Sequence, residues 1–168
     1  MTTVPCSLYN RIKMELRMSI SDRLKAAGVT LPDARPPVAN YVPFVITGNL
    51  LFISGQVSIT PDGLIKGRLG EDMTLEQGQH AARACAINLI AQMKLALGDL
   101  ERVTRIVKLG GFVNAAGDFT DIPKVVNGCS DLMVEIFGDK GRHARAAVAC
   151  PVLPMGAAVE VDAVVEFV

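Results

Sequence analysis

The segment from Thr74 to Gly98 constrains the fold most, because its end signals and its periodicity together predict one long helix. Thr74 and Gln77 have the spacing of a capping box, and Gly98 is a typical helix-ending residue. Apolar residues recur at helical spacing on one stripe between them: Ala82, Cys85, Ala86, Leu89, Met93 and Leu97. One face of this helix must therefore be buried against a core.

Runs with a β pattern lie on both sides of this helix, and a second helix interrupts them. Gly48-Asn49 joins the first two runs as a tight hairpin, and Pro61-Asp62-Gly63 is a further turn. Gly110-Gly111 predicts a bulge or bend in the central run. The predicted order is strands at 41–47 and 50–57, the long helix, a strand at 103–113, a helix from Pro123 to Gly138, and strands at 144–150 and 157–167.

The N-terminal region differs from the rest of the chain. Residues 1–17 are charged and weakly patterned, which predicts an extension that the core does not need. Ser19 or Ser21 can cap a short helix over 22–27, and Gly28 can end it. We therefore divide the chain into an N-terminal extension with a short helix at 1–33 and a single domain at 34–168.

The element order predicts an α+β fold, a mixed β-sheet with two main helices on one face. Two helices cannot cover both faces of so wide a sheet, so both should pack on the same face. The other face would then be apolar and open. Half of the residues are hydrophobic, and burial of this face between subunits predicts an oligomer.

Composition argues against several classes of partner. Lys+Arg and Asp+Glu both number 17 and aromatic residues make up 5%, whereas nucleic-acid binders normally show a basic, aromatic-rich surface. No apolar run is long enough to span a bilayer. The four cysteines and two histidines form no metal-binding pattern, which predicts buried free thiols and no metal site. A cytoplasmic protein without a nucleic-acid or membrane partner is the expectation.

Arg145 is the most conspicuous polar residue of the C-terminal half, because it interrupts the small apolar run HARAAVAC. If strands 144–150 and 157–167 pair antiparallel, Arg145 and Glu160 lie roughly opposite each other. Such a pair could be a cross-strand ion pair that serves only the sheet. It could equally hold a small carboxylate on the guanidinium and a water on the glutamate. Spacing alone does not decide between these interpretations, and His143 could lie at the edge of such a site.

The run A-R-A-A-V-A-C-P-V-L-P-M-G-A-A-V-E-V-D-A-V resembles the signature of the YjgF/Rid family (reactive intermediate deaminases, also called endoribonuclease L-PSP). Arg145, Leu153-Pro154 and Glu160 stand at the matching positions. Upstream, the resemblance includes Tyr41, Gly48-Asn49, Ser54-Gly55-Gln56 and Asn127. It covers about residues 34–168 and favours a longer-chain subgroup.

The resemblance implies a chorismate-mutase-like fold and a homotrimer with its sites in the clefts between subunits. Members with the arginine hydrolyse imines and enamines of the 2-aminoacrylate type to 2-keto acids and ammonia, without a metal or organic cofactor. By this resemblance Arg145 holds the substrate carboxylate with help from the backbone near Gly55, Glu160 positions the attacking water, and Tyr41 closes the site. Ser54, Asn127 and Ala147 complete the implied substrate-binding set.

The chain also departs from the family pattern. Ala147 stands where a cysteine is usual, which puts any thiol-dependent role in doubt, and extra residues at 121–125 precede Asn127. The alternative function is a non-catalytic trimer that binds a small carboxylate for regulation. Ribonuclease activity, which the older family name implies, has less support because the net charge is zero.

Overall fold

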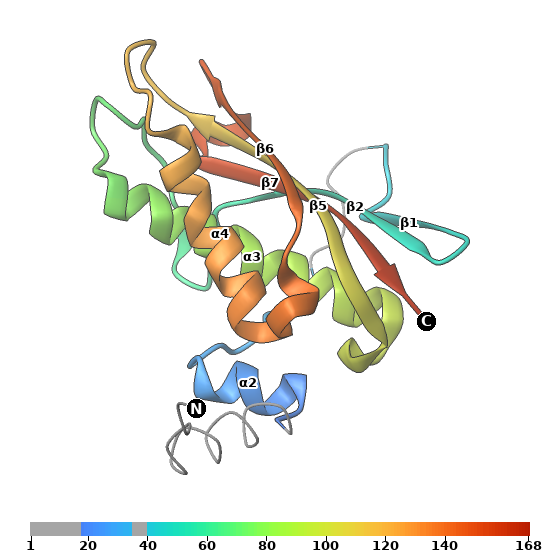
Figure 1. The fold of residues 1–168 in the computed structure, drawn as a ribbon. Helices are drawn as coiled ribbons and strands as arrows, with labels where there is room; N and C mark the ends of the chain where they lie inside the picture. Colours follow the sequence, from blue (N-terminus) through green and yellow to red (C-terminus); the bar gives the residue numbers. More distant parts are fainter. Residues whose placement is uncertain (1–17, 35–39) are drawn as a thin grey trace, which may run out of the picture.

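The computed structural model describes residues 18–34 and 40–168, and the predicted extension at 1–17 lies outside them. Figure 1 shows the elements along the chain. In order they are α2 (Ile20–Ala26), β1 (Phe44–Thr47), β2 (Leu50–Val57), β3 (Ile59–Thr60), β4 (Gly63–Leu64), α3 (Leu75–Leu97), a 3-10 turn (Leu100–Arg102), β5 (Val103–Asn114), α4 (Ile122–Phe137), a 3-10 turn (Gly138–Gly141), β6 (Ala144–Cys150), a 3-10 turn (Pro154–Gly156) and β7 (Val159–Phe167).

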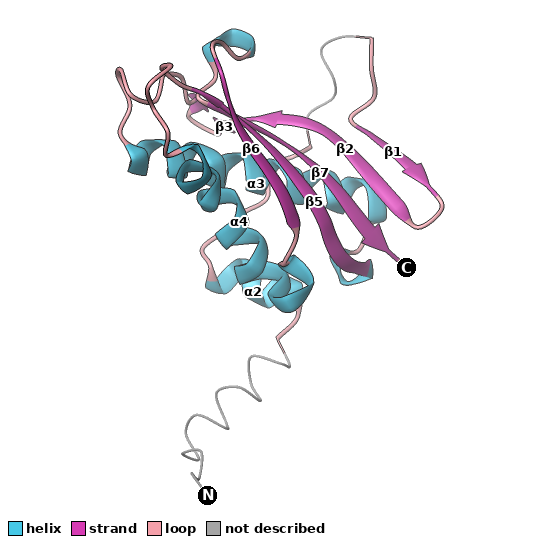
Figure 2. Cartoon of the chain, turned by 45° about the horizontal axis from the view of Figure 1, so that its top comes forward, coloured by secondary structure: helices cyan, strands magenta, loops and turns pink. Residues whose placement is uncertain are grey.

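The main sheet has five strands in the order β1-β2-β7-β5-β6. Strands β5 and β6 pair in parallel and the other neighbours are antiparallel. Helices α3 and α4 lie side by side against one face of this sheet, as Figures 1 and 2 show. The prediction of a mixed α+β fold with both main helices on one face is confirmed.

Both main helices begin and end within one residue of the positions that the sequence indicated. Thr74 and Gln77 form the complete capping box of α3, and the N–H of Gly98 closes its last turn on Lys94. Helix α4 has a proline in its first turn and ends at Gly138. The two helices approach closely at Gly128, where a Cβ would overlap the backbone carbonyl of Gln79.

The short helix α2 begins two residues earlier than the sequence suggested. Ser19 is its cap, because the Ser19 hydroxyl accepts a hydrogen bond from the Asp22 N–H. Glu101 accepts a second bond from the Ile20 N–H at 2.6 Å. Ile20 and Leu24 are buried in the same hydrophobic core as α3 and α4. The division of the chain at residues 33 and 34 remains a prediction.

The predicted pairing of the last two strands is wrong. Strand β6 pairs in parallel with β5, and β5 separates it from β7. The reason is the connection through α4: a strand that follows a helix on one face of a sheet returns parallel to the strand before that helix. Arg145 lies beside Leu109, whereas Glu160 lies beside Phe112 on one side and Val57 on the other.

The bulge predicted at Gly110-Gly111 is also wrong, because the register of β5 against β7 shifts earlier, between Val103 and Lys108. The two glycines are needed for space instead. A Cβ on Gly110 would overlap the Asp162 carboxylate, and one on Gly111 would overlap the Val126 side chain. Close approach from both faces of the sheet explains the pair of glycines.

Candidate functional site

The predicted site residues fall into two groups on opposite faces of the sheet. Arg145 shares the helix-covered face with its register partner Leu109, which is fully buried. Glu160 alternates with the buried residues Val159 and Val161 and therefore points to the open face. The two side chains do not form a cross-strand pair in this chain.

The first group is organised by helix α4 around the Arg145 guanidinium. Its Nη1 donates to Asn127 Oδ1 and to Ser130 Oγ, both at 2.9 Å. Its Nη2 donates to the backbone carbonyl of Pro123 at 3.1 Å. Asn127 and Ser130 lie three residues apart on α4 and so share one helix face. The first turns of α4 thus hold the predicted carboxylate-binding arginine.

This network leaves part of the guanidinium available. Arginine has five N–H donors, and three of them bond to Asn127, Ser130 and Pro123. The Nε–H and one Nη2–H have no acceptor among the described residues, and no carboxylate of the described chain forms an ion pair with Arg145. Two adjacent N–H groups of a guanidinium are suited to a carboxylate ligand.

Ser130 extends the first group to His143. The Ser130 hydroxyl lies 3.0 Å from His143 Nε2, and His143 Nδ1 lies 2.6 Å from the Gly141 carbonyl oxygen. Burial, together with the nearby charge of Arg145, lowers the pKa of His143 although the bond to Gly141 opposes this. Sequence reasoning missed Ser130, which its i+3 spacing from Asn127 could have indicated.

The second group, around Glu160, depends on the space above a glycine rather than on hydrogen bonds. Strand β2 is irregular between Ile53 and Gln56, where its pairing with β7 shifts. A Cβ on Gly55, inside this irregularity, would overlap the carboxylate of Glu160. Within the described part of the chain that carboxylate accepts no hydrogen bond. Burial, and secondly the charge of Asp162, raises the pKa of Glu160.

Ser54 precedes Gly55 on β2 and bonds to the segment that follows Tyr41. The Ser54 hydroxyl donates to the Val42 carbonyl at 2.8 Å, and the Ser54 N–H donates to the Pro43 carbonyl at 3.0 Å. Ser54 is thus a positioning residue for the segment before β1 rather than a nucleophile. Tyr41, at the start of that segment, is 49% exposed.

Ala147 belongs to the side of the first group. It lies two residues beyond Arg145 on β6, is partly buried and packs against the hydrophobic core. Gly55 and Glu160 therefore come together on one face, and Arg145, Asn127 and Ala147 gather on the other. The sequence had placed all of them in one site without indicating this division.

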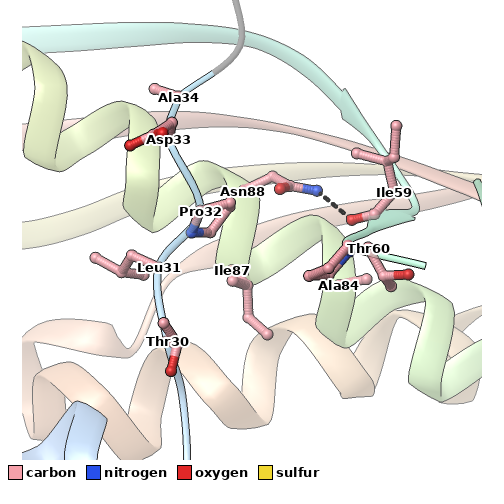
Figure 3. Close-up of a pocket in the computed structure, with 11 residues that line it drawn as sticks. Thr30, Leu31, Pro32, Asp33, Ala34, Ile59, Thr60, Ala84, Ile87 and Asn88 are labelled. Carbon is pink, nitrogen blue, oxygen red and sulfur yellow. Dashed lines mark hydrogen bonds between the residues drawn. The ribbon is translucent and has the colours of Figure 1, made fainter. Parts of the chain in front are cut away.

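A cavity of about 500 Å³ lies elsewhere, between the segment 30–34, helix α3 and the turn after β3. Figure 3 shows its residues, with the Asn88 amide donating to the Ile59 carbonyl at 2.9 Å across one wall. None of the predicted site residues lines this cavity. The cavity and the predicted chemistry are thus separate features of the molecule.

The titratable side chains of the described residues form no group of three or more that could hold a metal ion. Cys85 and Cys129 are buried free thiols, as predicted, whereas the free thiol of Cys150 is only partly buried and Cys6 lies outside the described residues. Burial raises the pKa of Cys129 to about 12, so it carries no thiolate at neutral pH. No helix in the described part of the chain is long and apolar enough to cross a membrane.

Comparison with known proteins agrees with this fold. A family model described as "YjgF/chorismate mutase-like, putative endoribonuclease" matches residues 21–167. The chain belongs to this family. Protein TCP17 of Trypanosoma cruzi is 49% identical over 149 residues, which cover 88% of this chain and 93% of that protein. The RutC family protein y4sK of Sinorhizobium fredii is 32% identical over 137 residues, which cover 82% of this chain and 94% of that protein.

A solved structure from Shewanella oneidensis, described as a "putative endoribonuclease", has a TM-score of 0.86 with this chain. Its sequence is 38% identical, and the match covers 89% of this chain and 100% of the Shewanella chain. The chorismate-mutase-like fold that the sequence resemblance implied is therefore confirmed.

Proposed function

We propose that the protein hydrolyses small imines and enamines of the 2-aminoacrylate type, at sites that two subunits build together. The observation that carries this proposal is the division of the predicted residues between two faces of one sheet. One face presents a cation with two free donors, and the other presents a half-buried carboxylate. A second copy of the chain would bring the Arg145 face of one subunit to the Glu160 face of another.

The first group suits the substrate carboxylate. Arg145 is rigidly held and keeps two N–H donors, so a planar carboxylate can bind it bidentately. The backbone N–H near Gly55 would supply a further donor from the neighbouring subunit. Binding at this position fixes the 2-carbon of the substrate beside the open face of the second subunit.

The second group suits the water. Glu160 has no competing hydrogen bond within the described chain, and its raised pKa makes it a better proton acceptor than an ordinary glutamate. Water adds to the imine carbon while a proton goes to the nitrogen. The resulting amino alcohol loses ammonia as the C–N bond breaks, and its oxygen becomes the keto group. Tyr41 would cover the site during these steps.

The open face of the sheet supports the assembly into a homotrimer. Val45 and Phe52 are register partners on β1 and β2, and they are 52% and 43% exposed. Val148 on β6 is similarly exposed, at 48%. Large apolar side chains on a sheet face are typical of subunit contacts. Light scattering should show a trimer at micromolar concentration, and a stable monomer would remove the shared site.

Mixed trimers test the shared site directly. Arg145→Lys and Glu160→Gln variants, each expected to retain only a few per cent of the native activity alone, are co-refolded and assayed for pyruvate release from 2-aminoacrylate generated in situ. Each mixed ring then contains one interface with both native residues, so random mixing should restore about one quarter of the native activity. The control is wild-type chain co-refolded with the Arg145→Lys, Glu160→Gln double variant.

The outcomes separate the candidate functions. Recovery in the mixture supports hydrolysis at a shared site. Full activity in either pure variant contradicts the assignment of that residue, and no recovery in verified mixed trimers contradicts the sharing. Carboxylate binding without turnover in the wild type would instead favour the non-catalytic regulatory trimer.

A further inference from the structure

We propose that Ser130 and His143 are positioning residues that fix the plane of the Arg145 guanidinium and thereby set its affinity for carboxylates. This inference rests on the proposed function for its kinetic consequence. Its structural part rests on the described hydrogen bonds and on the neutral form of His143. Neither residue belongs to the set that the sequence resemblance implied.

The direction of the hydrogen bonds follows from the Gly141 carbonyl. A carbonyl oxygen only accepts, so His143 Nδ1, at 2.6 Å from it, must carry the proton. In neutral His143 the other nitrogen, Nε2, is then an acceptor. The Ser130 O–H therefore points to Nε2 at 3.0 Å, which leaves the oxygen lone pairs of Ser130 for the Arg145 Nη1–H at 2.9 Å.

The neutral form of His143 is required for this order. The lowered pKa of His143, caused chiefly by burial and also by the charge of Arg145, favours that form at neutral pH. His143 thus holds the Ser130 proton away from the arginine. Without His143 the hydroxyl loses this acceptor and can turn to a backbone carbonyl of the preceding turn of α4, which redirects the oxygen lone pairs that accept from Nη1.

The consequence for Arg145 is geometric. Both hydrogens of Nη1 are hydrogen-bonded, one to Asn127 Oδ1 and one to Ser130 Oγ. The guanidinium group therefore cannot change its orientation without breaking a hydrogen bond. Asn127 alone would leave one of the Nη1 hydrogens free. The two unoccupied donors on Nε and Nη2 then have a fixed direction, which is what bidentate carboxylate binding requires.

The structural part is tested by nitrogen NMR of the intact protein, without substrate. The expected spectrum shows His143 as the neutral Nδ1–H tautomer and slow rotation of the Arg145 Nη groups. Ser130→Ala should speed that rotation and change the Nε2 signal of His143, and Ser130→Thr should restore both. A Nε2–H tautomer in the wild type, or Arg145 signals that Ser130→Ala leaves unchanged, would overturn the inference.

The kinetic part is tested by measuring, for each variant, the affinity for pyruvate and the KM and kcat for hydrolysis of 2-aminoacrylate. Ser130→Ala and His143→Ala should weaken pyruvate binding and raise KM by roughly tenfold, as expected for one lost bond to a charged group, and leave kcat within about twofold. Ser130→Thr should bind like the wild type. The matched controls are Ser21→Ala on α2 and His80→Ala on α3, both exposed and outside the network.

The two failures are distinguishable. A wild type that hydrolyses imines while folded Ser130→Ala keeps native KM and pyruvate affinity overturns the positioning role only. A wild type without turnover or pyruvate binding overturns the proposed function, and the NMR spectra then decide the fixed orientation of Arg145 on their own. Equal losses of melting temperature and kcat in all three variants would show a structural role instead.

Discussion

The Arg145 group and the Glu160 group are held in place by different physical means. Around Arg145, side chains and a carbonyl of α4 accept hydrogen bonds whose directions fix the guanidinium. Around Glu160, the carboxylate lies over Gly55 and accepts no hydrogen bond from the described residues. A cation that must bind a ligand in one orientation needs directional bonds. A carboxylate that must accept a proton is served by burial and free lone pairs.

The largest effect on activity is expected in the Arg145 group, which is held by directional hydrogen bonds. Arg145→Lys keeps the charge but cannot reproduce the fork or the bonds to Asn127 and Ser130. We expect kcat/KM for 2-aminoacrylate to fall by roughly 30- to 1,000-fold. Arg142→Lys is the control, because Arg142 is 72% exposed and pairs only with the exposed Asp139 among the described residues. Undiminished turnover in a folded Arg145→Lys trimer would contradict the whole assignment.

An intermediate effect on activity is expected in the Glu160 group, which depends on the space that Gly55 leaves for the carboxylate. Gly55→Ala would place a methyl group where the Glu160 carboxylate lies, and the carboxylate would have to move. Because the overlapping atoms belong to a side chain, the fold should survive. We expect kcat/KM to fall by about 10- to 100-fold. Gly117→Ala is the control, since a Cβ there meets open space; equal losses in both variants would show that the effect is not specific.

The smallest effect is on stability and tests the burial of Glu160. Its pKa is raised in the folded protein, so the native state binds more protons than the unfolded state between the ordinary value of 4.5 and the raised one. The unfolding free energy therefore falls as pH rises through this window and stays lower above it. The melting temperature of Glu160→Gln should be roughly a few degrees higher than that of the wild type at neutral pH.

Well below pH 4.5 the same variant and the wild type should melt together, because Glu160 is then protonated in both the folded and the unfolded state. Thermal melts at several pH values, with Asp118→Asn on the exposed loop as control, measure the difference. A Glu160→Gln variant that melts lower than wild type at neutral pH would show that the ionised carboxylate has a stabilising partner, such as a cation from a neighbouring subunit.

Most local structure could be predicted from particular residues, because the information lies within a few positions of each other. The Thr74–Gln77 capping box and the glycines at positions 98 and 138 defined both main helices. Pro61-Asp62 marked the turn between β3 and β4. The start of α2 was misplaced by two residues, since Ser19 and Ser21 are both good caps and only the bond to the Asp22 N–H distinguishes them.

Strand order was not predictable in the same way. The short loop between residues 150 and 159 suggested a hairpin, yet β6 joins the far edge of the sheet and β7 its middle. What decides this is the packing of α4 against the same face as α3, which places β6 parallel beside β5. Gly110 and Gly111 were misread for a similar reason, since the side chains that need their space come from β7 and α4.

The sequence by itself determined the helices, the alternation of the last strand, the family and the identity of Arg145 and Glu160 as the residues of interest. These depend on periodicity and on short motifs. Only the tertiary structure decided that the two residues lie on opposite faces of one sheet, and that Ser130 and His143 share the arginine's network. Side-chain partners across elements depend on strand order and helix packing, and contacts between residues distant in sequence set both.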